Sequence, residues 1–423
     1  MTTKQLGQGI VDDPIRSVHF FNGRLLTAED LLQEQSANAK GRARLGRVIG
    51  SGIANGLEVE ETIGVSTTSA PVVTVKPGIA INREGDTLAL PKPVSLALVR
   101  PQPGSGNGNG IGFGTCIPPE EGAYVAGAGA YLLTILPVEI NEGKAPVSGL
   151  GATDAACNTK YVAHGVQFRL LSISQSETQG VNQQHIRNRL AYRCFGALDP
   201  NLRDFTRNLL GPPVTSYGLI DELRPNRLYD CEVPLALFYW TSSGGLVFVD
   251  MWSVRRRVIA PDSAPRWSPL TGDRRAGEGE AMFMQFADHL NRLVLDGASP
   301  VSMRALDHFR WLPPVGIVPL ANALWPRGFS ELTFFDGITT RDPVHIEGAR
   351  LAHLVRASWS YPAHDLQSDV MLWLYIVREN MEAVADSPVS TSPQPYMVFA
   401  SGHLPFWGDP HHDVNRLSFT NAI

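Results

Sequence analysis

Short runs in which apolar and polar residues alternate fill much of the first 100 positions of the chain. We expect strands at 56–60, 71–76, 78–82, 88–91 and 94–99, separated by short polar turns. Alternation with a period of two places one face of each strand on a core and the other in water. The pattern therefore predicts a small antiparallel sheet or barrel near the N-terminus.

Longer apolar strands follow in the middle of the sequence. Residues 130–140 and 166–173 have this pattern, and the clearest hairpin pairs 233–240 with 246–254 across the loop Thr241–Gly245. Both arms of that hairpin are rich in aromatic and β-branched residues, and its loop contains two glycines. Two further strands are expected near the C-terminus, at 371–377 and 396–400.

A helix is predicted from residue 28 to 44. Thr27 is a good N-cap, and Glu29 and Asp30 place negative charge in the first turn, where the helix dipole favours it. Leu31 and Leu32 mark an apolar side, but much of the helix is polar. We expect it to lie on a surface or to pack against another subunit.

A second strong helix is predicted at 280–295, preceded by a polar turn at Glu278 to Glu280 and followed by Gly297 as a C-cap. Its apolar residues share one helical face: Met282, Phe283, Phe286, Leu290, Leu293 and Val294. Shorter helices are expected at 184–195, 201–210 and 303–310. Together the elements predict an α+β, β-rich fold with several small sheet or sandwich units and a few helices.

Composition changes at a few points along the 423 residues, and these points predict the domain boundaries. Residues 1–100 hold the N-terminal arm helix and a small β domain, and 101–122 form a Gly/Pro-rich loop. Residues 123–260 form a β-rich central domain, and 261–423 form an α+β C-terminal domain.

Charge is sparse along the chain and excludes some partners. Charged residues make up 18% of the sequence, the formal net charge is −5, and the densest basic run is only Arg255 to Arg257. A nucleic-acid-binding protein needs a basic stripe to neutralise phosphates, so we expect no nucleic-acid partner. Low charge also suits a subunit whose surface is partly covered by neighbours.

The ends and the cysteines indicate a soluble, cytoplasmic protein. The first ten residues contain no apolar run typical of a secretory signal, and no stretch has the length of a membrane span. Cys116, Cys157, Cys194 and Cys231 form no C-x-x-C pair, which excludes a zinc ribbon or a thioredoxin-like motif. We expect reduced thiols, with a Cys116–Cys157 bridge as the alternative.

One group of residues near the C-terminus is a candidate metal site, formed by His403, His411, His412 and Asp413. Imidazole and carboxylate ligands suit zinc or manganese. However, adjacent histidines on an extended chain point in opposite directions, and the segment also fits a plain turn. We therefore expect no bound metal there.

No other motif predicts catalysis or a cofactor. The glycine-rich run at 101–114 lacks G-x-G-x-x-G, and the spacing of His345 and His353 does not match H-E-x-x-H. No G-x-S-x-G sequence occurs either. Four aromatic residues could line a sugar-binding face, although core packing is the commoner role. These residues are Tyr239, Trp240, Trp252 and Trp373.

Several segments resemble a group of bacterial proteins associated with phage-tail-like contractile injection systems. Two lie near the N-terminus: FFNGRLLTAEDL from Phe20 and GSGIANGLEV from Gly50. Later segments that resemble the same group are 233–240, 248–250, 254–256, 311–316 and 374–380. The resemblance implies an accessory structural part of a contractile tail, such as a baseplate, collar, cage or fibre-mounting subunit.

The resemblance implies no catalytic residue and no cofactor. It implies a homo-oligomer that binds other tail subunits, within a particle that is released or acts at the cell envelope. From the residues, the N-terminal arm and helix are the expected interface, through Phe20, Phe21, Arg24, Leu25, Leu26, Leu31 and Leu32. Two alternatives remain open: a fibre-like module that binds a glycan or receptor, and a metal-dependent hydrolase.

Overall fold

The computed structural model of the chain describes most of its residues. These are 14–62, 71–98, 129–144, 159–199, 202, 216–224, 226–241, 243–260, 272–321, 328–368, 371–378 and 395–401. The predicted Gly/Pro-rich loop at 101–122 lies outside the described residues, as does nearly all of the predicted helix at 201–210.

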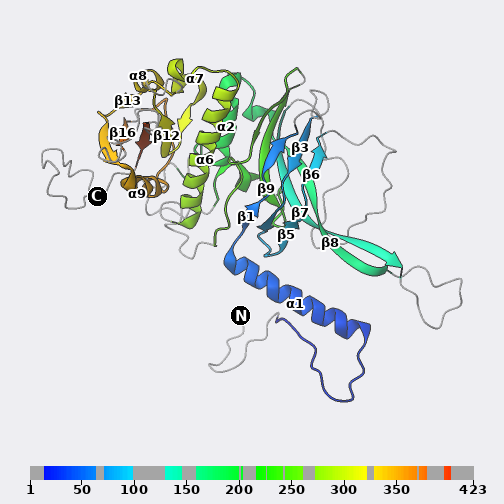
Figure 1. The fold of residues 1–423 in the computed structure, drawn as a ribbon. Helices are drawn as coiled ribbons and strands as arrows, with labels where there is room; N and C mark the ends of the chain where they lie inside the picture. The colour runs from blue at the N-terminus through cyan, green and yellow to red at the C-terminus, as the bar shows by residue number, and fades with distance from the viewer. Residues whose placement is uncertain are drawn as a thin grey trace, which may run out of the picture.

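Helix α1 (Ala28–Ile49) is the first element and confirms the predicted N-terminal helix. Thr27 forms a capping box with Asp30, as the sequence indicated. The helix continues five residues beyond its expected end, until Gly50 turns the chain with a φ of 111°. Figure 1 shows α1 leaving the body of the molecule, with its C-terminal end nearest to β1 and β5.

Two small antiparallel sheets follow α1. One has the order β1-β4-β5, from Gly52–Gly56, Gly78–Ile81 and Thr87–Leu90, and the other has the order β2-β3-β6, from Val59–Glu61, Val72–Val75 and Val94–Ala97. The single strand predicted at 56–60 is wrong, because Gly56 and Leu57 both have a φ of 59° and break it between β1 and β2. The predicted small sheet is thus divided into two open sheets.

The central sheet contains β7 (Gly129–Lys144), β8 (Thr159–Ser172), β9 (Val233–Thr241) and β10 (Gly245–Asp250). Its order is β10-β9-β7-β8, and all its pairs are antiparallel. The predicted hairpin at 233–254 is confirmed as β9–β10.

The two faces of the central sheet belong to different cores. Leu133 of β7 packs with residues of the two small sheets, whereas its neighbour Leu132 packs with α2 (Gln183–Cys194) and α4 (Gly218–Leu223). Successive side chains of a strand point to opposite faces, which explains this separation. Beyond the sheet, the outer parts of β7 and β8 pair only with each other and project as a two-stranded ribbon (Figure 1).

Helix α6 (Asp273–Leu295) connects the central part to the C-terminal sheets. It begins two turns before the predicted start, so the polar turn expected around Gly279 is helical. A Cβ atom at Gly279 would lie 2.1 Å from the carbonyl oxygen of Trp359. Glycine at this position therefore permits close packing of the helix and does not mark a turn.

The C-terminal part has a mixed five-stranded sheet in the order β12-β17-β16-β13, with β14 also paired to β16. Phe286 and Leu290 of α6 pack on it from one side, together with the short helices α7 (Ala305–His308) and α8 (Glu331–Phe334). Helix α9 (Gly348–Ser358) contributes to a second core on the same sheet. The strands are β12 (Val315–Pro319), β13 (Thr339–Thr340), β14 (Val344–Glu347), β16 (Met371–Arg378) and β17 (Tyr396–Ala400).

The remaining described elements are short. Strands β11 (Trp311–Leu312) and β15 (His364–Asp365) form a two-stranded pair, and 3-10 turns occur at Gln175–Glu177 and Pro300–Ser302. The predicted fold class is confirmed: the chain is α+β, with several separate and mostly antiparallel sheets. The predicted domain boundaries stay a prediction. Among the described helices, none combines the length and apolar composition that crossing a bilayer requires.

Candidate functional site

The arm formed by residues 14–27 folds back onto the start of α1 through a few polar contacts. The backbone N–H of Val18 donates to Glu34 Oε2 at 3.1 Å, and Arg24 Nη1 donates to the carbonyl oxygen of His19 at 2.7 Å. Arg24 also pairs with Asp30. Hydrogen bonds from the backbone and side chain of Thr27, followed by Arg24, lower the pKa of Asp30. Arg24, a predicted interface residue, therefore holds the arm against the helix.

Large apolar side chains on this arm and on α1 are exposed. We call this set the N-terminal surface: Phe20, Phe21, Leu25, Leu26, Leu31, Leu32, Leu45, Val48 and Ile49. Their exposed fractions run from 53% to 89%. Nine of the twenty strongly exposed large apolar residues in the described part of the chain thus fall between positions 20 and 49. Exposed apolar groups concentrated in one region mark sites of protein interaction.

Helix α1 contacts the body of the molecule through a small part of its length. Its buried residues are only Ala37 and Gly46, among those that the structure describes. A Cβ atom on Gly46 would lie 2.0 Å from the carbonyl oxygen of Gly85, so the last turns of α1 touch the β4–β5 turn backbone to backbone. The rest of the helix is free to contact another molecule.

A second feature is an arginine-lined pocket of about 550 Å³. Seven parts of the fold line it. They are the end of α1, the start of β1, the β4–β5 turn, α4, the start of β9, the segment at 254–260 and α6. Its charged lining residues are Arg47, Arg83, Arg224, Arg256 and Arg274, with Asp221, Asp230, Glu232 and Glu278. This volume is within the range of small-molecule sites.

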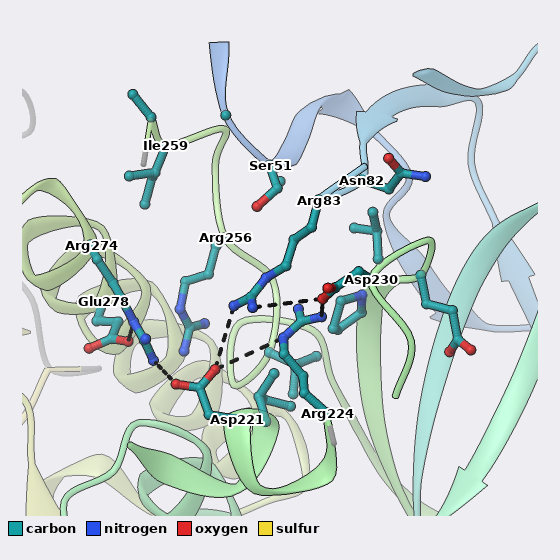
Figure 2. Close-up of a pocket in the computed structure, with 18 of the residues that line it drawn as sticks. Ser51, Asn82, Arg83, Asp221, Arg224, Asp230, Arg256, Ile259, Arg274 and Glu278 are labelled. Carbon is teal, nitrogen blue, oxygen red and sulfur yellow. Dashed lines mark hydrogen bonds and ion pairs between the residues drawn. The ribbon is translucent and has the colours of Figure 1, made fainter. Parts of the chain in front are cut away.

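Asp221 of α4 is the buried centre of this lining (Figure 2). Its Oδ2 lies 2.7 Å from Arg274 Nη2, and its Oδ1 lies 3.5 Å from Arg83 Nη2 and 3.9 Å from Arg224 Nε. Asp230 is the second shared partner, 3.3 Å from Arg224 Nη1 and 3.8 Å from Arg83 Nη1. The carboxylates of Asp221 and Asp230 thus hold the guanidinium groups of three arginines on one side of the pocket.

Glu278 is held at the α6 side of the pocket. The hydroxyl of Tyr217 donates to Glu278 Oε2 at 2.7 Å, and Arg274 Nε donates to Oε1 at 3.1 Å. Burial, followed by the negative charge of Glu278, raises the pKa of Tyr217, so this phenol stays protonated. The Tyr217 hydroxyl therefore holds Glu278 in place by a donated hydrogen bond.

The other predicted sites fall in different places. His403, His411, His412 and Asp413 lie outside the described residues. In the part of the chain that is described, no three His, Cys, Asp or Glu side chains gather in a way that could hold a metal ion. His345 is exposed on β14, and His353 is exposed on α9.

The four aromatic residues considered for sugar binding do not form one cluster. Trp240 packs against the core between the central and small sheets, and Tyr239 against the core on the opposite face. Trp373 packs in a core of the C-terminal sheet, and Trp252 lies beneath the guanidinium of Arg255.

The cysteines differ from the expectation. Cys194 is a buried free thiol, as predicted, and burial raises its pKa to about 12. Cys231 is disulfide-bonded, so the expectation of reduced thiols is wrong for this residue. The alternative bridge between Cys116 and Cys157 lies outside the described residues.

The pocket was missed by sequence analysis because its residues are scattered from Arg47 to Glu278. Pairs that meet only in the folded chain leave no local spacing to detect. The sole local signal was the run Arg255 to Arg257, from which Arg256 enters the pocket.

No protein-family model matches the chain, and no curated protein matches it. Among solved structures, one described as the crystal structure of TssK is similar at 11% sequence identity, with a TM-score of 0.19. The similarity covers 48% of this chain and 51% of that chain, so it spans about half of each. At this TM-score it carries no argument about fold or function.

Proposed function

We propose that the chain is a structural subunit that assembles with other protein chains through the N-terminal surface. The observation that carries the proposal is the exposure of nine large apolar side chains, four on the arm and five on α1, a helix with few buried residues. Leu31, Leu45 and Ile49 fall on one side of α1, because their separations are close to whole numbers of helical turns.

The energetics favour burial of this surface by a partner. Covering a large apolar side chain contributes about 1.5–3 kcal/mol before the costs of ordering and association. The sum over nine side chains that are 53–89% exposed is of the same order as those costs, and area alone does not set affinity. A closed ring of identical subunits would repeat the same contact and add avidity.

Within this proposal, the particle is a phage-tail-like contractile injection particle. The resemblance of the segments from Phe20 and Gly50 to proteins of such systems supports this context. The chain would act there as a baseplate, collar, cage or fibre-mounting component, bound to its own copies and to other tail subunits. In this role it binds and positions its neighbours and carries out no catalysis.

Matched triple variants test the proposal. The first changes Leu25, Leu31 and Leu45 to serine. The control changes Val301, Leu332 and Leu295, which are also exposed but lie elsewhere, to serine. Exposed substitutions of this kind change folding stability by only a few tenths of a kcal/mol each, so both variants should fold.

Sedimentation of cell extracts that contain each tagged chain provides the measurement. We expect the unaltered chain and the control in a fast-sedimenting assembly, and the first variant as a monomer of 46.0 kDa plus the mass of its tag. An unaltered chain that sediments at that monomer mass would count against assembly. Equal loss of assembly in both variants would show that the N-terminal surface is not the interface.

A further inference from the structure

The arginine-lined pocket holds more positive charge than its carboxylates neutralise. Five arginines and four carboxylates line it. Two further arginines reach the same carboxylates from outside the lining: Arg169 lies 2.6 Å from Glu232, and Arg275 lies 3.8 Å from Glu278. Each carboxylate therefore already has at least one guanidinium partner.

Arg256 is a lining arginine that is held by backbone carbonyl oxygens and by the ring of Phe195, whose centroid lies 4.7 Å from its guanidinium carbon. Its Nη1 donates to the carbonyl oxygens of Arg255 at 2.8 Å and Trp252 at 3.1 Å, and its Nη2 donates to that of Ser253 at 3.2 Å. No carboxylate of the described residues lies within ion-pair distance of it. Figure 2 draws no interaction between its side chain and either Glu278 or Asp221.

Arg224 also has a hydrogen-bond donor without an acceptor in the pocket. Its Nε is buried without a hydrogen-bond partner, although Asp221 lies 3.9 Å away. Burial, followed by the positive charge of Arg83, lowers the pKa of Arg224 to about 10. Burial also lowers the pKa of Arg256, and the positive charge of Arg274 acts in the same direction. Like charges crowded in a partly dry site are relieved by an anion.

We propose that this pocket binds a small organic anion. Its carboxylate or phosphate oxygens would lie among the guanidinium groups of Arg83 and Arg224, which share Asp221 and Asp230, and that of Arg256, which lines the same pocket. Guanidinium groups bind such oxygens by charge-assisted, often bidentate hydrogen bonds. Asp221 and Asp230 act as positioning residues, because each holds two of these arginines by its carboxylate.

The rest of the lining indicates that the ligand has an apolar part. Ile220, Val233, Pro234, Val254 and Ile259 line the same pocket. A volume of about 550 Å³ also exceeds what a bare phosphate or carboxylate needs. A ligand that joins an anionic group to an apolar body therefore matches the lining better than an inorganic ion does.

Calorimetric titration with three probes tests the proposal at constant ionic strength: inorganic phosphate, phenyl phosphate and benzoate. We expect phenyl phosphate to bind at least tenfold more tightly than inorganic phosphate, because its ring reaches the apolar wall. Binding of phenyl phosphate alone, or of benzoate alone, supports the proposal and identifies the anionic group. Failure of all three to bind at millimolar concentration would overturn it.

Three variants assign the binding to these arginines. Arg256→Gln and Arg83→Gln should each weaken the binding of phenyl phosphate at least tenfold. Arg292→Gln is the control, because Arg292 pairs with Asp296 on the exposed surface of α6 and should not affect binding. Unchanged affinity in both Arg256→Gln and Arg83→Gln would contradict the proposed site.

A footprint of the unaltered protein provides a test that does not depend on folding of the variants. Phenylglyoxal modifies accessible arginines, so bound phenyl phosphate should slow the modification of Arg83 and Arg256 but not that of Arg292. Equal modification with and without the probe would overturn the assignment. None of the nine residues of the N-terminal surface lines this pocket, so the titration can fail or succeed whatever the outcome of the sedimentation experiment above.

Discussion

At the residue scale, a buried ion pair joins three parts of the fold. Arg187 of α2 donates from Nε to Asp250 Oδ2 at 2.9 Å and from Nη2 to Asp288 of α6 at 2.5 Å. Gln285 of α6 donates to the same Asp250 oxygen at 2.9 Å. Asp250 ends β10 and has no exposed surface. The central sheet, α2 and α6 therefore share one charged group.

Removing Arg187 should be costly because it leaves Asp250 charged, buried and only partly hydrogen-bonded. We expect Arg187→Met to lower the free energy of unfolding by about 3–5 kcal/mol. Arg292→Met, which breaks an exposed pair on α6, should cost less than about 1 kcal/mol. Denaturant titration measures both. A loss for Arg187→Met no larger than for the control would show that the network does not hold the parts together.

His364 makes stability depend on pH. It is buried, its Nε2 lies 2.6 Å from Ser401 Oγ, and burial lowers its pKa to about 4. The unfolded chain binds this proton near the ordinary histidine pKa of about 6.5, so stability is full above that pH and falls between pH 6.5 and 4. His289 adds to the loss, because burial lowers its pKa well below the ordinary value.

The difference of pKa at His364 corresponds to about 3 kcal/mol at pH 4. In His364→Gln we expect this part of the pH dependence to disappear from denaturant titrations at pH 7 and pH 4. His164→Gln, at an exposed histidine of β8, should keep the full dependence. If the unaltered protein, His364→Gln and His164→Gln all lost the same free energy of unfolding between pH 7 and pH 4, the assignment to His364 would be contradicted.

Sequence analysis could not predict the Arg187–Asp250 ion pair because its partners are far apart in the sequence. Arg187 and Asp250 lie 63 positions apart, and nothing in the sequence around either one indicates its partner. The Thr27–Asp30 capping box was predictable because it is local.

At the element scale, α1 is fixed to the body by a contact that requires glycine. A Cβ atom on Gly46 would meet the backbone of Gly85, whereas one on Gly41 of the same helix would meet nothing within 4 Å. Gly41→Ala should therefore stabilise α1 by up to about 1 kcal/mol through helix propensity alone.

Gly46→Ala should have the opposite effect despite the same propensity, because the clash pushes α1 away from the β4–β5 turn. Hydrogen exchange of residues 43–49 and 82–86 provides the measurement, with faster exchange expected in Gly46→Ala only. Exchange that is equal in the two variants would mean that the close contact does not anchor the helix.

Element predictions succeeded where a pattern was long and unbroken. Strands β7 and β9 and helix α1 follow their patterns, whereas β8 begins seven residues before its predicted start at 166 and β10 ends four residues before its predicted end at 254. The start of α6 was placed too late because Gly279 and its flanking glutamates were taken as a turn, although Gly279 lies in the helix and packs closely against the backbone of Trp359. Helix α9 was not predicted. Its apolar residues Leu351, Leu354 and Val355 pack on the C-terminal sheet.

At the scale of the whole molecule, two elements extend from a body of packed sheets and helices (Figure 1). One is α1 with its arm, and the other is the outer ribbon of β7 and β8, whose Ile140, Tyr161 and Val162 are exposed. These exposed apolar residues support the proposed assembly with other chains. Sequence analysis named Phe20, Phe21, Leu25 and Leu26 of the arm as expected interface residues, and this stays a prediction. The exposed apolar residues near the C-terminal end of α1 emerged only from the structure.

The most direct test of the assembly proposal compares hydrogen–deuterium exchange of residues 14–49 in two samples. One is the isolated 46.0 kDa chain, and the other is the largest assembly in which the chain sediments from native cells. We expect exchange to be at least tenfold slower in the assembly, because a partner covers the arm and orders α1. Unchanged exchange, or a native chain that sediments only as the 46.0 kDa species, would contradict the proposal.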